Sequence, residues 1–137
     1  MVLKRFFSTK SVSGSLASFG LLVLRVAISA MMLTHGLAKI ANFSTLSPNF
    51  DLIGIGGDLS LALVIFAEVF CSIALILGFL TRLATFPLIF AMGVAIFIKH
   101  AADAFTVKEL ALLYLTVYVV LLLTGPGRYS VDRAVWR

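Results

Sequence analysis

The sequence predicts an all-α integral membrane protein built as a four-helix bundle. Of its 137 residues, 61% are hydrophobic and only 12% are charged, whereas about 25% of residues are charged in an ordinary soluble domain. So few polar side chains could not cover a water-exposed surface. The chain also contains four long apolar segments, and about 20 such residues are enough to cross the hydrocarbon core of a bilayer. The clearest of these segments is Leu59–Leu80.

The first membrane helix is expected over residues 16–40. The basic stretch before it, residues 1–15, is read as a short cytoplasmic tail on the membrane surface. The apolar segment behind it is too long for a cleaved signal peptide. At 100° per residue, five residues of this helix, among them all of its charged ones, fall within about 40° of one line, with His35 about 80° away from it. They are Arg25, Ser29, Met32, Gly36 and Lys39.

Residues 41–58 form the longest connection, which we expect to be an outer loop with a short interfacial helix or a re-entrant turn. Its glycines, Gly54-Ile-Gly-Gly57, lack the lysine and the spacing of a phosphate-binding loop. The second helix, residues 59–80, carries Glu68 near its middle. A carboxylate at that depth costs about 2.5–3.5 kcal/mol on insertion scales, so Glu68 should face the protein interior and have a partner.

The third helix is expected over residues 83–101 and the fourth over residues 107–124. At the end of the third, Lys99 and Asp103 are four residues apart and are predicted to pair. On the fourth, Tyr114 and Tyr118 lie on the side opposite Glu109 and are interpreted as lipid-facing or packing residues. A last interfacial helix over residues 130–136 should begin at Ser130 as its N-cap, with Asp132 in its first turn.

The distribution of basic residues predicts that both termini lie in the cytoplasm. Seven lysines and arginines fall in the tails and the second inter-helix turn, against three on the opposite side, Lys39, Lys99 and Lys108. Because the basic residues sit at the ends of membrane segments, they indicate orientation and not nucleic-acid binding. The seven are Lys4, Arg5, Lys10, Arg82, Arg128, Arg133 and Arg137.

Ionisable residues of different helices are predicted to lie at neighbouring depths, most of them in the outer half of the bundle. At 1.5 Å per residue, His35 lies roughly 8 Å from the outer boundary, Glu68 roughly 14 Å and Arg25 roughly 22 Å. The sequence therefore predicts a polar pocket in the outer half of the bundle, with Arg25 beneath it. Glu68 and His35 are its candidate catalytic residues. The candidate ligand-binding residues are Arg25, Lys39, Lys99, His100 and Glu109.

This pocket has two interpretations. Its groups either form compensated ion pairs that fix the register of the helices, or they bind a polar head group and relay protons between His35 and Glu68. A metal or haem site is not expected, because two histidines on different helices without a Glu-x-x-His motif are a weak signal. A single cysteine, Cys71, provides no internal dithiol.

Several short motifs, in this order and spacing, resemble the DoxX family over residues 21–137. They include Thr34-His35-Gly36-Leu37-Ala38-Lys39, the Glu68-Val69 pair followed by Leu77–Arg82, and Gly125–Asp132. The resemblance implies a four-helix protein of the bacterial inner membrane. The residues that match the family pattern are Arg25, His35, Lys39, Glu68, Arg82, Glu109, Ser130 and Asp132.

The same resemblance implies a link to membrane redox chemistry. Name-giving relatives belong to a quinone-linked sulfur-oxidising complex, and other members are associated with thiol or oxidative stress. The leading hypothesis is a membrane subunit that supports a quinone-linked oxidoreductase, with quinone as the ligand and a membrane or soluble oxidoreductase as the partner. A small-solute carrier or channel and a structural membrane partner without a ligand are the alternatives.

Overall fold

The computed structural model describes residues 14–136 and is helical throughout, with no strand in that range. Four of its helical stretches are long and apolar enough to cross a membrane: Ser15–Ala41, Gly57–Leu77, Thr81–Lys99 and Phe105–Thr124. The predicted all-α fold with four spans is thereby confirmed. The basic tail expected on the membrane surface lies almost wholly outside the described residues.

Two of the four spans change their helical type along their length. The first span is one α-helix, α2 (Ser15–Ala41), and the fourth is α7 (Phe105–Thr124). The second joins α4 (Gly57–Ile65) to α5 (Ser72–Leu77) through a π-helix, η2 (Phe66–Cys71). The third runs from α6 (Thr81–Val94) into a second π-helix, η3 (Ala95–Lys99).

Short helices lie at the two ends of the bundle. The connection after α2 contains α3 (Phe43–Leu46) and the 3-10 turn η1 (Ser47–Asn49), and the chain ends with α8 (Val131–Val135). These elements define the α3 end and the α8 end of the molecule. Ser130 accepts a hydrogen bond from the backbone N–H of Arg133, so its predicted role as the N-cap of α8 is confirmed.

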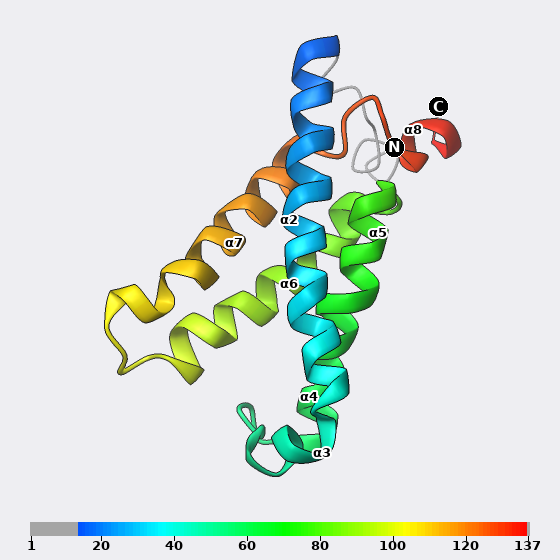
Figure 1. The fold of residues 1–137 in the computed structure, drawn as a ribbon. Coiled ribbons are helices and arrows are strands. Elements are labelled where there is room, and N and C mark those ends of the chain that lie inside the picture. Colours follow the sequence, from blue (N-terminus) through cyan, green and yellow to red (C-terminus); the bar gives the residue numbers. More distant parts are fainter. Residues whose placement is uncertain (1–13, 137) are drawn as a thin grey trace.

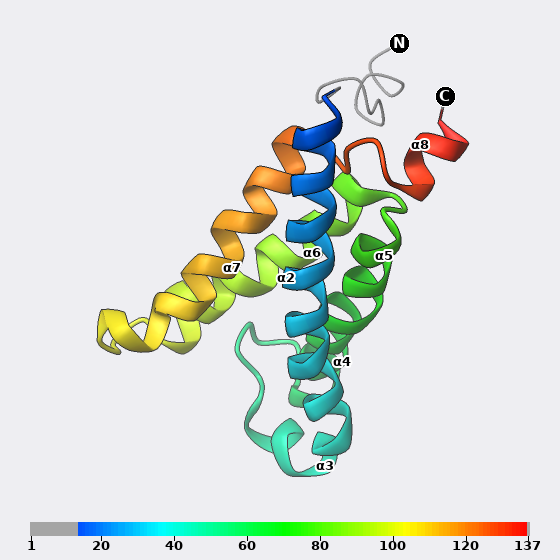
Figure 2. The same ribbon diagram turned by 45° about the horizontal axis from the view of Figure 1, so that its top comes forward.

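The spans form two antiparallel pairs that are close together at the α8 end and diverge toward the other end. Figures 1 and 2 show α2 running beside α4 and α5, whereas the α6–α7 turn lies well away from α3. The packed core follows the seam between the pairs, where Leu75, Leu88, Tyr118 and Leu121 have no exposed surface. The divergence leaves room between the pairs at the level of the two π-helices.

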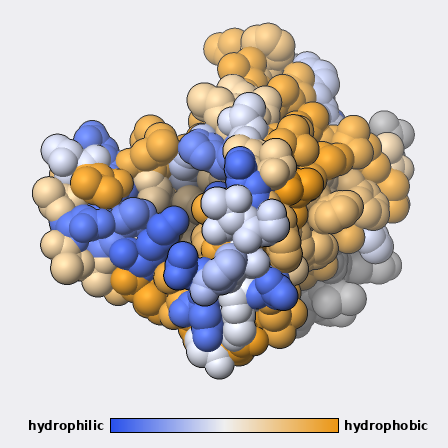
Figure 3. Space-filling view, turned by 60° about the horizontal axis from the view of Figure 1, so that its bottom comes forward, coloured by the Kyte–Doolittle hydropathy of each residue, from blue (hydrophilic) through white to orange (hydrophobic). Residues whose placement is uncertain are grey.

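Large apolar side chains cover the outside of the bundle. Phe70, Phe90 and Leu123 are each more than 60% exposed, which would be unfavourable in water but suits contact with acyl chains. Seen from the α3 end, the hydrophilic residues gather over the α3 loop and over the α6–α7 turn (Figure 3). Both places therefore suit the polar boundary of a membrane.

Candidate functional site

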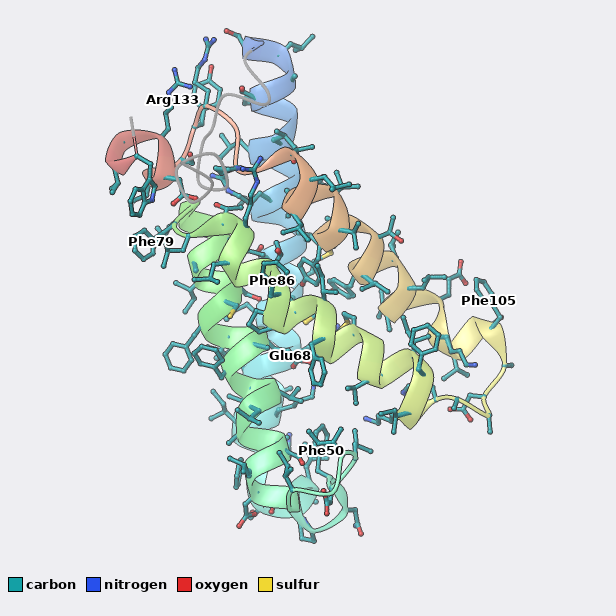
Figure 4. The ribbon with its side chains drawn as sticks, turned by 180° about the vertical axis from the view of Figure 1, so that it is seen from behind. Phe50, Glu68, Phe79, Phe86, Phe105 and Arg133 are labelled. Atoms are coloured by element: carbon teal, nitrogen blue, oxygen red, sulfur yellow. The ribbon has the colours of Figure 1, made fainter. Side chains whose placement is uncertain are left out.

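Glu68 lies inside η2, near the middle of the second span, and is 3% exposed. Figure 4 places it at the centre of the bundle, where α2, the second span and α6 come together. A π-helical turn inserts one extra residue into a helix, and such turns are frequent at functional sites. The insertion rotates the residues that follow it, so Glu68 and Ser72 both face inward despite the change in helical type.

A basic group from a neighbouring span reaches Glu68, as the sequence predicts. The ammonium group of Lys39, in the last turn of α2, donates a hydrogen bond of 2.7 Å to Oε2 of Glu68. The Glu68 side chain is 5% exposed and that of Lys39 is 20% exposed. The pair is therefore buried on its acidic side and reaches the surface on its basic side.

Gly36 allows this approach of α2 to η2. A Cβ atom at Gly36 would lie 2.6 Å from Cγ2 of Val69 and 3.0 Å from Cβ of Glu68, which is shorter than any ordinary contact. Only glycine therefore lets the two backbones come so close at this level. The Lys39–Glu68 pair therefore depends on Gly36, which lies three residues before Lys39 in α2.

The Lys39–Glu68 pair lines a cavity of about 200 Å³ between the two helix pairs. His35 and His100 also line it, and so does Tyr114. The rings of His35 and Tyr114 meet edge to face, with their centroids 5.9 Å apart. Four of the predicted pocket residues, His35, Lys39, Glu68 and His100, are thus brought together around one cavity. Its other lining residues are Met32, Met92, Ala95, Val107, Leu110 and Ala111.

Tyr114 and Tyr118 face the bundle interior, so they are packing residues and not lipid-facing ones. They are 5% and 0% exposed, and their rings stack with centroids 6.2 Å apart. The hydroxyl of Tyr118 has no hydrogen-bond partner among the described residues. The sequence contained a signal for this burial: both tyrosines lie on the helix face opposite Glu109, and Glu109 is exposed.

Arg25 lies closer to the α8 end than Glu68 does and does not line the cavity. It is 1% exposed, and its guanidinium donates hydrogen bonds to the carbonyl oxygens of Pro126 (2.6 Å) and Tyr129 (2.7 Å). These partners are backbone groups more than 100 residues away in the chain, so no local sequence pattern marks them. Arg25 therefore holds the segment between α7 and α8 and is not among the residues that line the cavity.

Asp132 and Arg82 complete the cluster at the α8 end. The carboxylate of Asp132 accepts hydrogen bonds from the backbone N–H groups of Leu80 (2.7 Å) and Thr81 (2.9 Å), which caps the first turn of α6. Arg82 Nε donates to the carbonyl oxygen of Leu122 in the last turn of α7. Charged side chains thus satisfy helix ends that would otherwise be unpaired in a dry environment.

The remaining predicted site residues lie apart from Glu68. Lys99 Nζ stands over the ring of Phe50, 5.4 Å from its centroid, and does not line the polar cavity. The predicted Lys99–Asp103 pair is wrong, because Asp103 instead contacts Nδ1 of His100 at 2.7 Å. The π-helical turn η3 ends at Lys99 and alters the residue spacing on which that prediction rested. Glu109 is exposed and lies outside the cavity lining.

The cavity combines a hydrogen-bond donor, a carboxylate and aromatic rings in a partly enclosed place. Lys39 can donate, Glu68 can accept, and the imidazole of His35 can do either according to its tautomer. Among residues 14–136, no three His, Cys, Asp or Glu side chains gather closely enough to hold a metal ion. The arrangement suits a flat polar group that offers carbonyl or hydroxyl oxygens.

Comparison with known proteins identifies relatives of the same size. The DoxX family model matches residues 20–101. The inner membrane protein YqjF of Escherichia coli (strain K12) is 34% identical over 123 residues, which cover 86% of this chain and 93% of that protein. An uncharacterized protein of Haemophilus influenzae is 32% identical over 121 residues, or 83% of this chain and 89% of that protein. No solved structure matches.

Proposed function

Since this chain belongs to the DoxX family, we propose that it is a membrane subunit or accessory of a quinone-linked oxidoreductase, and that the polar cavity receives the quinone head group. The single observation that carries the proposal is the Lys39–Glu68 pair beside an open cavity, 2.7 Å between its atoms. Ionisable groups within a membrane are functional candidates by default. The relation of this pair to the cavity favours binding over a purely structural role.

A quinone ring fits the lining by its chemistry. Its two carbonyl oxygens need donors, which Lys39 and His35 supply, and its flat face can pack against the ring of Tyr114. Reduction to the quinol consumes two electrons and two protons. The oxidoreductase partner would deliver the electrons, and Glu68 with His35 would pass the protons.

The setting in the cell is part of the same proposal. The seven basic residues of the tails and the second turn, against three at the α3 end, favour cytoplasmic termini. The cavity would then open in the outer half of a bacterial inner membrane, as the name of the Escherichia coli relative suggests. An enzymatic activity of this chain alone is not required, because the partner holds the electron donor.

A small-solute carrier is the other candidate, but the α8 end argues against it. There Arg25, Asp132 and Arg82 are bound to backbone groups, and a polar path across the bilayer would have to break these contacts. Uptake into proteoliposomes would support the carrier. The absence of uptake together with quinone binding would favour the oxidoreductase role.

Quinone binding by the purified protein in detergent provides the direct test. A short-tailed benzoquinone is titrated against the wild type, Glu68→Gln and His35→Ala, with Glu109→Gln as the matched control because Glu109 is exposed outside the cavity. We expect Glu68→Gln and His35→Ala to weaken binding at least tenfold and Glu109→Gln to leave it unchanged. If both cavity variants bound the quinone and supported quinone-dependent electron transfer in membranes as the wild type does, the proposal would be wrong.

A further inference from the structure

A second cavity lies beside the polar one, and its lining is almost entirely apolar. Its volume is about 250 Å³, and it is formed between the α4–η2 stretch, the α6 helix and the loop that carries Phe50. Leu63 and Ala67 line one wall, and Phe90 and Ala91 line the other. These residues precede or follow those of the polar cavity in the chain, but Glu68, Lys39 and His35 do not reach this space.

One residue in the lining of this apolar cavity carries a buried hydroxyl group that has no hydrogen-bond partner among residues 14–136. Ser60 lines it and is 4% exposed, and its Oγ makes no hydrogen bond to any described residue. A buried hydroxyl without a hydrogen bond is unfavourable, because it has lost its bonds to water without gaining others. Ser60 therefore points to a ligand that brings an acceptor or donor oxygen into an otherwise apolar space.

A cation lies next to Phe50, one of the lining residues of the same cavity, and forms no ion pair with a carboxylate of the described residues. Lys99 ends the third span, and its ammonium lies over the ring of Phe50, which lines the cavity. Lys99 takes part in neither the Lys39–Glu68 pair nor the contact between His100 and Asp103. Its position at the end of a membrane span is the depth at which lipid phosphates lie.

The three features follow one another in depth. Lys99 lies at the boundary, and Ser60 lies in the first turn of α4. The apolar walls then continue inward from Ser60 to Ala67, which is roughly 10 Å along the helix. From the boundary inward, the protein therefore offers a cation, then a hydroxyl group, then an apolar slot. A molecule with a charged head, an oxygen-containing linker and an apolar tail would match these features in the same order.

We propose that this cavity is a binding site for an anionic phospholipid. One acyl chain lies between α4–η2 and α6, an ester oxygen of the glycerol accepts a hydrogen bond from Ser60, and the phosphate pairs with Lys99. The site is independent of quinone binding, because it shares none of the residues of the polar cavity. A phospholipid held here would fill the space left by the divergence of the two helix pairs.

The test is lipid retention by the full-length protein in detergent, measured by native mass spectrometry. The probes are phosphatidylglycerol and phosphatidylcholine with identical acyl chains, and we expect the wild type to prefer phosphatidylglycerol at least fivefold. Lys99→Gln should abolish the preference, and Ser60→Ala should weaken retention of both lipids. The matched control is Lys108→Gln, since Lys108 lies at the same end and donates to the carbonyl of Ala101 without lining the cavity.

The proposed binding of an acyl chain in the slot is tested in two ways, with a variant that fills the slot and with lipids of different chain length. Ala91→Phe fills the slot and should reduce retention of both lipids at least fivefold. Independently of whether that variant folds, the wild type should retain phosphatidylglycerol with long chains at least tenfold better than with six-carbon chains. An unchanged headgroup preference in Lys99→Gln, retention that does not depend on chain length, or displacement of the phospholipid by a free fatty acid would each overturn the proposal.

Discussion

The two buried charge clusters of this bundle are built in different ways. At the α8 end, Arg25 donates to two backbone carbonyl groups and Asp132 accepts from two backbone N–H groups. In the other half, Glu68 is bound to another side chain, Lys39, beside a cavity. Backbone groups at helix ends cannot leave, whereas a side chain can turn toward a ligand. The first cluster is therefore suited to stability and the second to binding.

The space around two glycines also distinguishes the two clusters. A Cβ atom at Gly78 would lie 2.5 Å from Cβ of Ser130 and 3.1 Å from the Arg25 guanidinium carbon, so the α8 end is packed without space. Gly36 is equally close to Glu68 on one side, but the far side of the Lys39–Glu68 pair faces the cavity. The two clusters differ in free space more than in burial.

Removing Arg25 should have the largest effect on stability. Arg25→Met would leave the carbonyl groups of Pro126 and Tyr129 without their donor, and each buried unpaired group costs about 1–3 kcal/mol. We expect a loss of about 3 kcal/mol or more in the free energy of unfolding in detergent. Arg25→Lys should recover only part of it, because an ammonium lacks the planar fork that reaches two acceptors. A wild-type melting temperature in Arg25→Met would remove the contrast between the two clusters.

The sequence predicted the inward side of α2 correctly. Arg25, Ser29, Met32 and Gly36 share one line at helical spacing and are all buried, because their burial follows from local periodicity and the cost of polar groups in lipid. The meeting of Lys39 with Glu68 was also within reach, since antiparallel helices of known length bring similar depths together.

The sequence could not predict the partners of Arg25 or the course of the third span. Arg25 binds carbonyl oxygens of Pro126 and Tyr129, and every residue carries such a group, so no side-chain pattern marks these two. The π-helical turn η3 ends at Lys99, so Lys99 and Asp103 do not share the helix face on which their i, i+4 pairing was predicted. Local periodicity thus gives the faces of regular helices, whereas contacts with backbone and changes of helical type depend on tertiary packing.

Breaking the Lys39–Glu68 pair should cost less than removing Arg25. Lys39→Gln strands a buried carboxylate, but the adjoining cavity can admit water or let the group become neutral. We therefore expect a loss of about 1–3 kcal/mol, between the values for exposed and fully buried pairs. The double variant Lys39→Gln/Glu68→Gln should be more stable than the sum of the single effects predicts, which a double-mutant cycle in detergent measures. Strict additivity would show that the two side chains do not stabilise each other.

The smallest effect is expected at the pair that joins His100 to Asp103. Their atoms are 2.7 Å apart, as close as those of Lys39 and Glu68, yet the side chain of Asp103 is 47% exposed. Solvent and salt screen such pairs, which contribute less than about 0.5 kcal/mol when isolated on a surface. Asp103→Asn should therefore leave the melting temperature in detergent nearly unchanged, at low and at high salt. If Asp103→Asn destabilised the protein as much as Lys39→Gln, distance and not burial would decide the strength of these pairs, and the difference between the two halves of the bundle would need another cause.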